Sequence, residues 1–79
     1  VKYMGICFFD GKYTYRRIEK LLEKFVEENL HLRLERLFLD YNNLKKIPPV
    51  VAKFTNLRLI NIRHNNLEEF PAEICKLPL

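Results

Sequence analysis

The sequence has few cysteines, no long apolar run and no large excess of charge, and each absence narrows the class of protein. Its 79 residues include two cysteines, Cys7 and Cys75, near opposite ends of the chain. Small secreted domains are commonly held by several disulfides, so we expect a reducing, intracellular location in the cytoplasm, with two buried or half-buried thiols. No apolar run reaches the ~18 residues of a membrane span, and no signal peptide is visible.

The net charge of the chain is small and positive. Fourteen Lys and Arg residues against ten Asp and Glu residues give a formal net charge of +4. Nucleic-acid binding would require these cations on one face. The densest group of cations is Arg16, Arg17, Lys20 and Lys24, and it is interleaved with Glu19 and Glu23. This mixture argues against a nucleic-acid partner.

Motifs for catalysis or metal binding are also missing. Gly11-Lys12 lacks the upstream glycine and the following Ser or Thr of a phosphate-binding loop. The Cys and His residues share no zinc spacing. Nothing marks a third group to orient a Cys75–His64 nucleophile. We therefore expect no enzyme activity, no catalytic residue, no metal, no cofactor and no small-molecule substrate.

What the sequence does contain is a duplicated window. The pattern Leu34-x-x-Leu37-x-Leu39-x-x-Asn42-x-Leu44 recurs as Leu57-x-x-Ile60-x-Ile62-x-x-Asn65-x-Leu67, at an offset of 57 − 34 = 23. Ile47-Pro48 and Phe70-Pro71 extend the match. Alternation of apolar and polar residues predicts a short strand in each copy. Asn then favours a turn, and the proline predicts an extended or tightly turned return segment.

The first 33 residues follow another pattern. Apolar residues at helical spacing, including Ile18, Leu22 and Phe25, predict an amphipathic helix over about Tyr15–Glu28. Thr14 is a suitable N-cap, and Asn29 is suited to end the helix. Arg16 and Arg17 then stand at the helix N-terminus, where the helix dipole disfavours cations.

Two interpretations of the segment before this helix stay open. The residues 3–13 match the repeat pattern at an offset of 34 − 3 = 31, with Gly11 in place of the asparagine. In that case residues 1–33 are an irregular first repeat with the helix on its far side. Alternatively, a strand over residues 3–9 and a turn at Asp10-Gly11 form a hairpin-plus-helix cap.

The duplicated pattern resembles the leucine-rich repeat superfamily, whose units have 20–29 residues. The resemblance implies an α/β solenoid with short parallel strands on a concave face, one N-terminal helix on the convex side and proline-bearing returns. Its units would be residues 1–33, 34–56 and 57–79, in one domain that is truncated from a longer protein. The structural repeat positions are Leu34, Leu37, Leu39, Asn42, Leu44, Leu57, Ile60, Ile62, Asn65 and Leu67.

The resemblance also implies a function. In this family the concave face holds a partner protein, so we expect a protein–protein interaction module. Strand alternation predicts the partner-binding positions, which are Arg36, Phe38, Asp40, Tyr41, Leu59, Asn61, Arg63 and His64. Parallel stacking would also place Glu35 beside Arg58 and Asp40 beside Arg63. The alternative is the repeat region of a larger regulatory enzyme or receptor, such as a kinase, GTPase, ubiquitin ligase or immune-type receptor.

Overall fold

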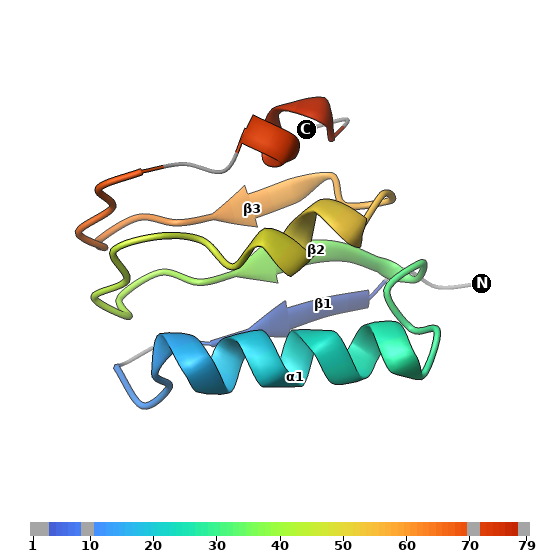
Figure 1. Cartoon of the computed structure of the whole chain (residues 1–79), viewed down its shortest axis with the longest axis horizontal. Helices are drawn as coiled ribbons and strands as arrows, with labels where there is room; N and C mark the ends of the chain where they lie inside the picture. The colour runs from blue at the N-terminus through green and yellow to red at the C-terminus, as the bar shows by residue number, and fades with distance from the viewer. Residues whose placement is uncertain (1–3, 9–10, 70–71, 78–79) are drawn as a thin grey trace.

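The computed structural model describes residues 4–8, 11–69 and 72–77. Short strands alternate with helical segments along the chain (Figure 1). The elements are β1 (Met4–Cys7), the α-helix α1 (Tyr15–Glu27), β2 (Leu34–Phe38), the 3₁₀ helix η1 (Pro49–Lys53), β3 (Leu59–Asn61) and the 3₁₀ helix η2 (Ala72–Lys76). None of the helices in these ranges is long and apolar enough to cross a membrane.

The three strands form one parallel sheet in the order β1-β2-β3. Ile6 pairs with Leu37, an offset of 37 − 6 = 31, and Phe38 pairs with Asn61, an offset of 61 − 38 = 23. These are the two offsets found in the sequence. The segment Met4–Cys7 therefore lies beside β2 in a parallel sheet. Asp10, part of the alternative hairpin turn, lies outside the described residues, and the division into units at 33/34 and 56/57 stays a prediction.

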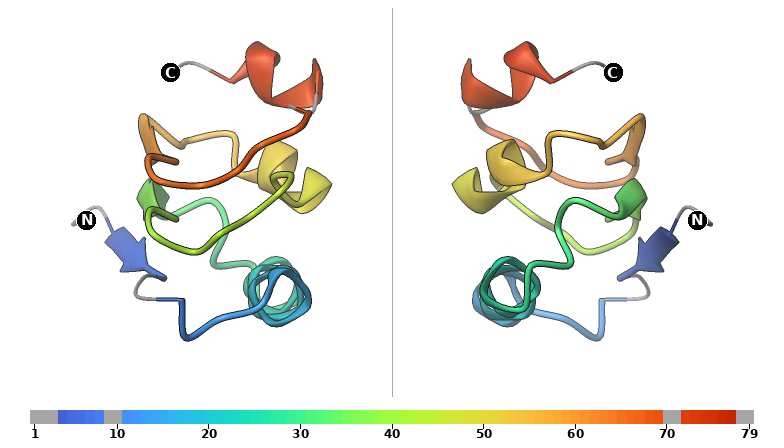
Figure 2. Two further views of the ribbon diagram at one scale, coloured as in Figure 1. Left: turned by 90° about the vertical axis from the view of Figure 1, so that its left-hand side faces the viewer. Right: turned by 90° about the vertical axis from the view of Figure 1, so that its right-hand side faces the viewer.

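The strands line one side of the molecule, and α1, η1 and η2 line the other (Figure 2). The core lies between these two layers. Phe54, Leu34, Leu37 and Leu57 are completely buried in it, as are Ile18 and Leu22 of α1. Apart from Leu57, the repeat positions of the second window are less buried, and Ile60, Ile62, Asn65 and Leu67 are only half-buried. The reason is that β3 is the last strand in the sheet order, so these residues are covered from one side only.

Helix α1 forms because its apolar residues recur on one face and both ends are capped. The side chain of Thr14 accepts a hydrogen bond from the backbone N–H of Arg17 at 3.2 Å. At the other end, Asn29 has a left-handed backbone with φ of 61°, and the N–H of Leu30 donates to the carbonyl of Phe25. These bonds form a Schellman cap. Glu28 is the capping residue, so α1 is one residue shorter than expected.

The return segments of the later repeats are short 3₁₀ helices. Pro49 occupies the first turn of η1, where its missing N–H leaves no hydrogen bond unmade. Val51 and Phe54 are buried and close the core behind β2, and Ile74 of η2 takes the place that corresponds to Val51 at an offset of 74 − 51 = 23. Phe70 and Pro71 lie outside the described residues.

Candidate functional site

The predicted partner-binding residues lie on the sheet and on the turns that follow its strands. Cys7, Phe38 and Asn61 form one row across the three strands. Arg36 pairs with Leu59 two residues earlier, in the preceding row on the same face of the sheet. We call this surface the outer sheet face. It comprises Arg36, Phe38, Asp40, Tyr41, Leu59, Asn61, Arg63 and His64.

Five of these side chains are exposed and three are half-buried. Arg36, Tyr41, Leu59, Arg63 and His64 are exposed, whereas Phe38, Asp40 and Asn61 are half-buried. Phe38 is therefore less accessible than strand alternation alone suggests. Tyr41 exposes 54% of its surface and Leu59 exposes 43%. Tyr41 and Leu59 are the large apolar side chains on this face that a partner can cover.

Tyr41 and His64 stack on each other after the ends of β2 and β3. Their ring centroids are 4.2 Å apart and the ring planes differ by 14°. Both residues have a left-handed backbone, with φ of 61° for Tyr41 and 57° for His64. This conformation is uncommon for residues that carry a Cβ atom. The same unusual turn therefore recurs in both repeats and aligns the two rings.

Asparagine side chains hold these turns in place. Asn65 Oδ1 accepts hydrogen bonds from the backbone N–H of Asn42 at 3.1 Å and of Leu44 at 2.8 Å. Its Nδ2 atom donates to the carbonyls of Leu39 and Ile62. The side chain thus satisfies backbone groups of two neighbouring turns, which explains why the sequence pattern requires an amide at this position.

Gly5 of β1 sits beneath the side chain of Arg36. A Cβ atom added at Gly5 would lie 3.4 Å from Arg36 Nε. The absence of a side chain at Gly5 therefore leaves space in which the guanidinium lies across β1.

One of the two predicted ion pairs forms. Arg58 Nη1 lies 3.7 Å from Glu35 Oε1, and the backbone N–H of Arg58 donates to the Glu35 carbonyl. The predicted Asp40–Arg63 pair was wrong, because no salt bridge joins these two residues, both of which the structure describes. Asp40 and Arg63 follow the ends of their strands, so strand alternation no longer sets the direction of their side chains.

The two cysteines also differ from expectation. Cys7 and Cys75 are both free and exposed, not buried. Cys7 projects from the outer side of β1, and Cys75 lies on η2. In the part of the chain that the structure describes, no three His, Cys, Asp or Glu residues gather as metal ligands would.

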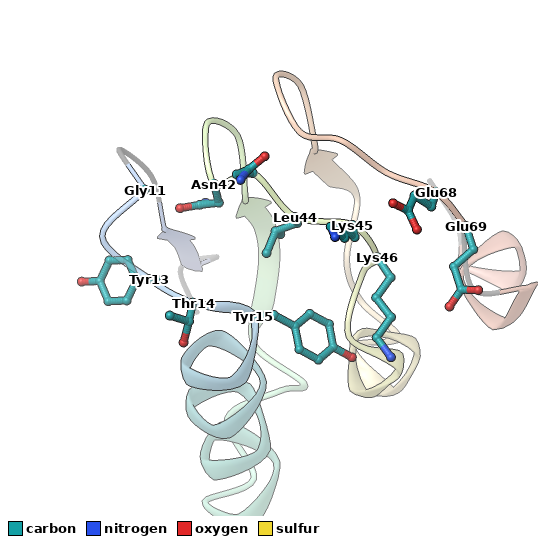
Figure 3. A pocket seen from close by; sticks show the side chains of 11 residues that line it. Gly11, Tyr13, Thr14, Tyr15, Asn42, Leu44, Lys45, Lys46, Glu68 and Glu69 are labelled. Carbon is teal, nitrogen blue, oxygen red and sulfur yellow. The ribbon is translucent and has the colours of Figure 1, made fainter.

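A second candidate site lies where the chain leaves the strands and crosses to the side of the molecule formed by the helices. A cavity of about 640 Å³ separates the start of α1 from the segment after β2 (Figure 3). We call it the return cavity. Its walls include Tyr13, Tyr15, Leu44, Lys45 and Lys46.

Tyr15 and Lys46 meet at one end of the return cavity. Lys46 Nζ lies 5.1 Å from the centroid of the Tyr15 ring, within the range of a cation–π contact. The Tyr15 hydroxyl donates to Glu19 Oε2 at 3.4 Å. Burial raises the pKa of Tyr15, and the negative charges of Glu19, Glu69 and Glu23 raise this pKa further. The cavity was not predicted from the sequence. The offset of 31 exceeds the offset of 23 by eight residues (31 − 23 = 8), which was a signal that the first return segment differs from the second.

Comparison with known proteins identifies the class. A family model described as Leucine Rich repeats (2 copies) matches residues 32–72, which is more than half of the chain. Together with the parallel strands and the asparagine turns, this match shows that the chain belongs to the leucine-rich repeat family.

The individual relatives are all named for their repeats. The chain is 50% identical over 44 residues to leucine-rich repeat-containing protein sog2 of Schizosaccharomyces pombe, covering 56% of this chain and 5% of that protein. It is 34% identical over 64 residues to leucine-rich repeat-containing protein 58 of Xenopus laevis, covering 81% of this chain and 18% of the relative. It is 38% identical over 63 residues to leucine-rich repeat and IQ domain-containing protein 4 of Homo sapiens, covering 80% of this chain and 11% of the relative.

The chain thus spans less than a fifth of the length of each of these relatives. Their names state no enzymatic activity. No solved structure matches the chain.

Proposed function

We propose that this chain is a protein–protein interaction module that docks a partner protein on the outer sheet face, the concave face of a leucine-rich repeat solenoid. One observation carries the proposal. Among the described residues, three large hydrophobic side chains are exposed, and two of them, Tyr41 and Leu59, belong to this face. Exposed apolar side chains rimmed by polar residues are typical of protein interaction sites.

The chemistry of the face supports this role. Tyr and Arg, with Trp, are enriched at the energetic centres of protein interfaces. Tyr41 is held by its stack on His64, so its ring loses little conformational entropy when a partner covers it. Arg63 and Arg58 stand at the rim and are exposed. A partner surface with an apolar centre and acidic edges would complement this arrangement.

The proposal extends to the setting of the chain. The successive units of a solenoid within a longer protein are residues 1–33, 34–56 and 57–79. Its ligand is a partner protein, not a small molecule or a nucleic acid. An intracellular, cytoplasmic location is part of the proposal, because Cys7 and Cys75 are free and exposed, as thiols are in a reducing compartment.

A matched pair of variants tests the docking face. The double variant Tyr41→Asn with Leu59→Glu removes the exposed apolar surface, and Asn tolerates the left-handed backbone at position 41. The control Leu32→Glu changes an equally exposed leucine, with 46% of its surface accessible, outside this face. Proteins captured by the unmodified chain are identified first, and their affinity is then measured directly with each variant.

The double variant should bind such a partner at least about tenfold more weakly, whereas Leu32→Glu should bind it unchanged. Circular dichroism and thermal midpoints should stay close to those of the unmodified chain for both. Equal binding by the double variant and the unmodified chain would remove the outer sheet face as the docking surface.

A further inference from the structure

The return segments of the two regular repeats are joined by backbone hydrogen bonds. The N–H of Asn66 donates to the carbonyl of Leu44 at 2.9 Å, and the N–H of Glu68 donates to the carbonyl of Lys45 at 2.7 Å. These bonds continue the pairing of β2 and β3 beyond the strands. They close the space between the second and third units.

The corresponding bonds between the first and second units are missing. The equivalent donors are the N–H groups of Asn43 (66 − 23 = 43) and Lys45 (68 − 23 = 45), and neither donates to a partner within residues 4–8, 11–69 and 72–77. By the offset of 31 the acceptors would be the carbonyls of Tyr13 (44 − 31 = 13) and Thr14 (45 − 31 = 14), and the Thr14 carbonyl accepts from the N–H of Ile18 instead. Asn43 also differs from Asn66 in its left-handed backbone, with φ of 54°. Asn43 and Lys45 both line the return cavity.

The return cavity arises because the return segments of the first and second units differ in width. The first unit returns through the 13-residue helix α1, and the second returns through the five-residue 3₁₀ helix η1. Because an α-helix is wider, the two segments diverge where α1 begins, as Figure 3 shows between Tyr13–Tyr15 and Leu44–Lys46. Its volume of about 640 Å³ is within the usual range of ligand sites.

Asn42 also differs from its counterpart Asn65 in the hydrogen bonds of its side chain. Asn65 Oδ1 accepts two backbone N–H groups of the preceding unit. Asn42 occupies the equivalent position, exposes 6% of its surface, and its Oδ1 atom is buried with no hydrogen-bond partner. Asn42 also lines the return cavity. Asn42 thus leaves a buried acceptor without a partner at the junction where Asn65 has its acceptor bonded twice.

We propose that the return cavity binds an extended polypeptide segment of a partner protein, with an acidic residue facing Lys45 and Lys46. Carbonyl oxygens of such a segment accept from the N–H groups of Asn43 and Lys45, in place of the missing bonds between the units. The Tyr13 and Tyr15 rings and Leu44 provide apolar surface for alternate side chains. This site is separate from the outer sheet face and does not depend on it.

The charges around the cavity favour a single acidic residue over an acidic run. Lys45 and Lys46 line it, and neither forms a salt bridge in the described part of the chain. Glu68 and Glu69 line the far wall on the next return segment, and they would repel additional carboxylates. A segment with one carboxylate among apolar and neutral residues satisfies both conditions.

The probe is a capped hexapeptide of alternating valine and threonine with one central glutamate, titrated into the full chain and followed by heteronuclear NMR. Binding should shift the amide signals of Asn43 and Lys45 and slow their hydrogen exchange, because these N–H groups gain acceptors. The same peptide with lysine in place of glutamate should bind about tenfold more weakly. The variant Lys46→Glu should reverse this preference.

The outcomes separate this proposal from the docking of a partner on the outer sheet face. The double variant Tyr41→Asn with Leu59→Glu should bind the peptide as the unmodified chain does. No shift at Asn43 and Lys45 up to about 2 mM peptide would overturn the proposal, and so would equal binding of the glutamate and lysine peptides. If Lys46→Glu does not fold, the comparison of the two peptides on the unmodified chain still decides the charge preference.

Discussion

The side-chain oxygen of Asn65 accepts a hydrogen bond from the backbone N–H of Leu44, 21 residues earlier, at 2.8 Å. The same oxygen accepts from the N–H of Asn42 at 3.1 Å. One amide therefore joins the turn after β3 to the turn after β2. Substitution at Asn65 should act on the contact between units rather than on one turn alone.

Asn65→Ala should lower the free energy of unfolding by about 2–4 kcal/mol, because it leaves partly buried N–H and carbonyl groups of both turns without partners. Asn66→Ala is the matched control. Asn66 is exposed, and within the described part of the chain its side chain bonds to that of Asn43 alone, so the loss should stay below about 1 kcal/mol. Urea denaturation of both variants measures the difference. Equal losses would show that the Asn65 side chain does not join the units.

Phe54→Ala should lower the free energy of unfolding by about 3–5 kcal/mol. Phe54 is completely buried and is the largest of the fully buried side chains, and its ring lies edge-to-face against His31 at 6.2 Å. Removal of the ring leaves a cavity in the centre of the core. Leu32→Ala, at an exposed position, should change stability by less than about 0.5 kcal/mol in the same denaturation experiment. A small effect of Phe54→Ala would contradict the described core.

Arg17→Glu should stabilise the chain by about 0.3–1 kcal/mol at low salt. Helix α1 has no acidic residue in its first turn, and Arg17 stands there against the positive end of the helix dipole. The backbone N–H of Arg17, which bonds to Thr14, is retained in the variant. The gain should shrink as salt is raised, because the site is exposed and screened. A gain that does not change with salt would point to a cause other than the helix dipole.

In the variant Tyr15→Phe, the free energy of unfolding should fall less at alkaline pH than it does in the unmodified chain. The pKa of Tyr15 is raised above its ordinary value of 10.0, first by burial and then by the charge of Glu19. A raised pKa in the folded state means that the folded chain holds its proton more tightly than the unfolded chain. The resulting stabilisation is complete below pH 10 and is lost as the pH rises through the folded-state pKa.

Denaturation midpoints of the unmodified chain and of Tyr15→Phe, measured from pH 8 upward in steps of about one unit, check this expectation. The difference between the two should be constant below the ordinary tyrosine pKa and should change only above it. Parallel curves over the whole range would show that Tyr15 has the same proton affinity in the folded and unfolded states.

Several features could be read from the sequence because they depend on local spacing. The offsets of 23 and 31 gave the strand register, as the pairs Phe38–Asn61 and Ile6–Leu37 show. Thr14 and Asn29 marked the two ends of α1 to within one residue, because capping depends on the side chain and backbone of a single residue. Positions beyond the strand ends were harder to predict. Asp40 and Arg63 follow those ends, and the pairing expected from strand alternation does not form there.

The sequence by itself determined the repeat period, the parallel register and the buried positions of the first window, because each follows from the order of apolar residues and turn-forming asparagines. Only the tertiary structure decided which surfaces stay open. Phe38 is half-buried although alternation predicts an exposed side chain, and the stack of Tyr41 on His64 does not follow from alternation. The return cavity likewise exists only when an α-helical return packs beside a 3₁₀ return, since the space is created by the difference in width between neighbouring units.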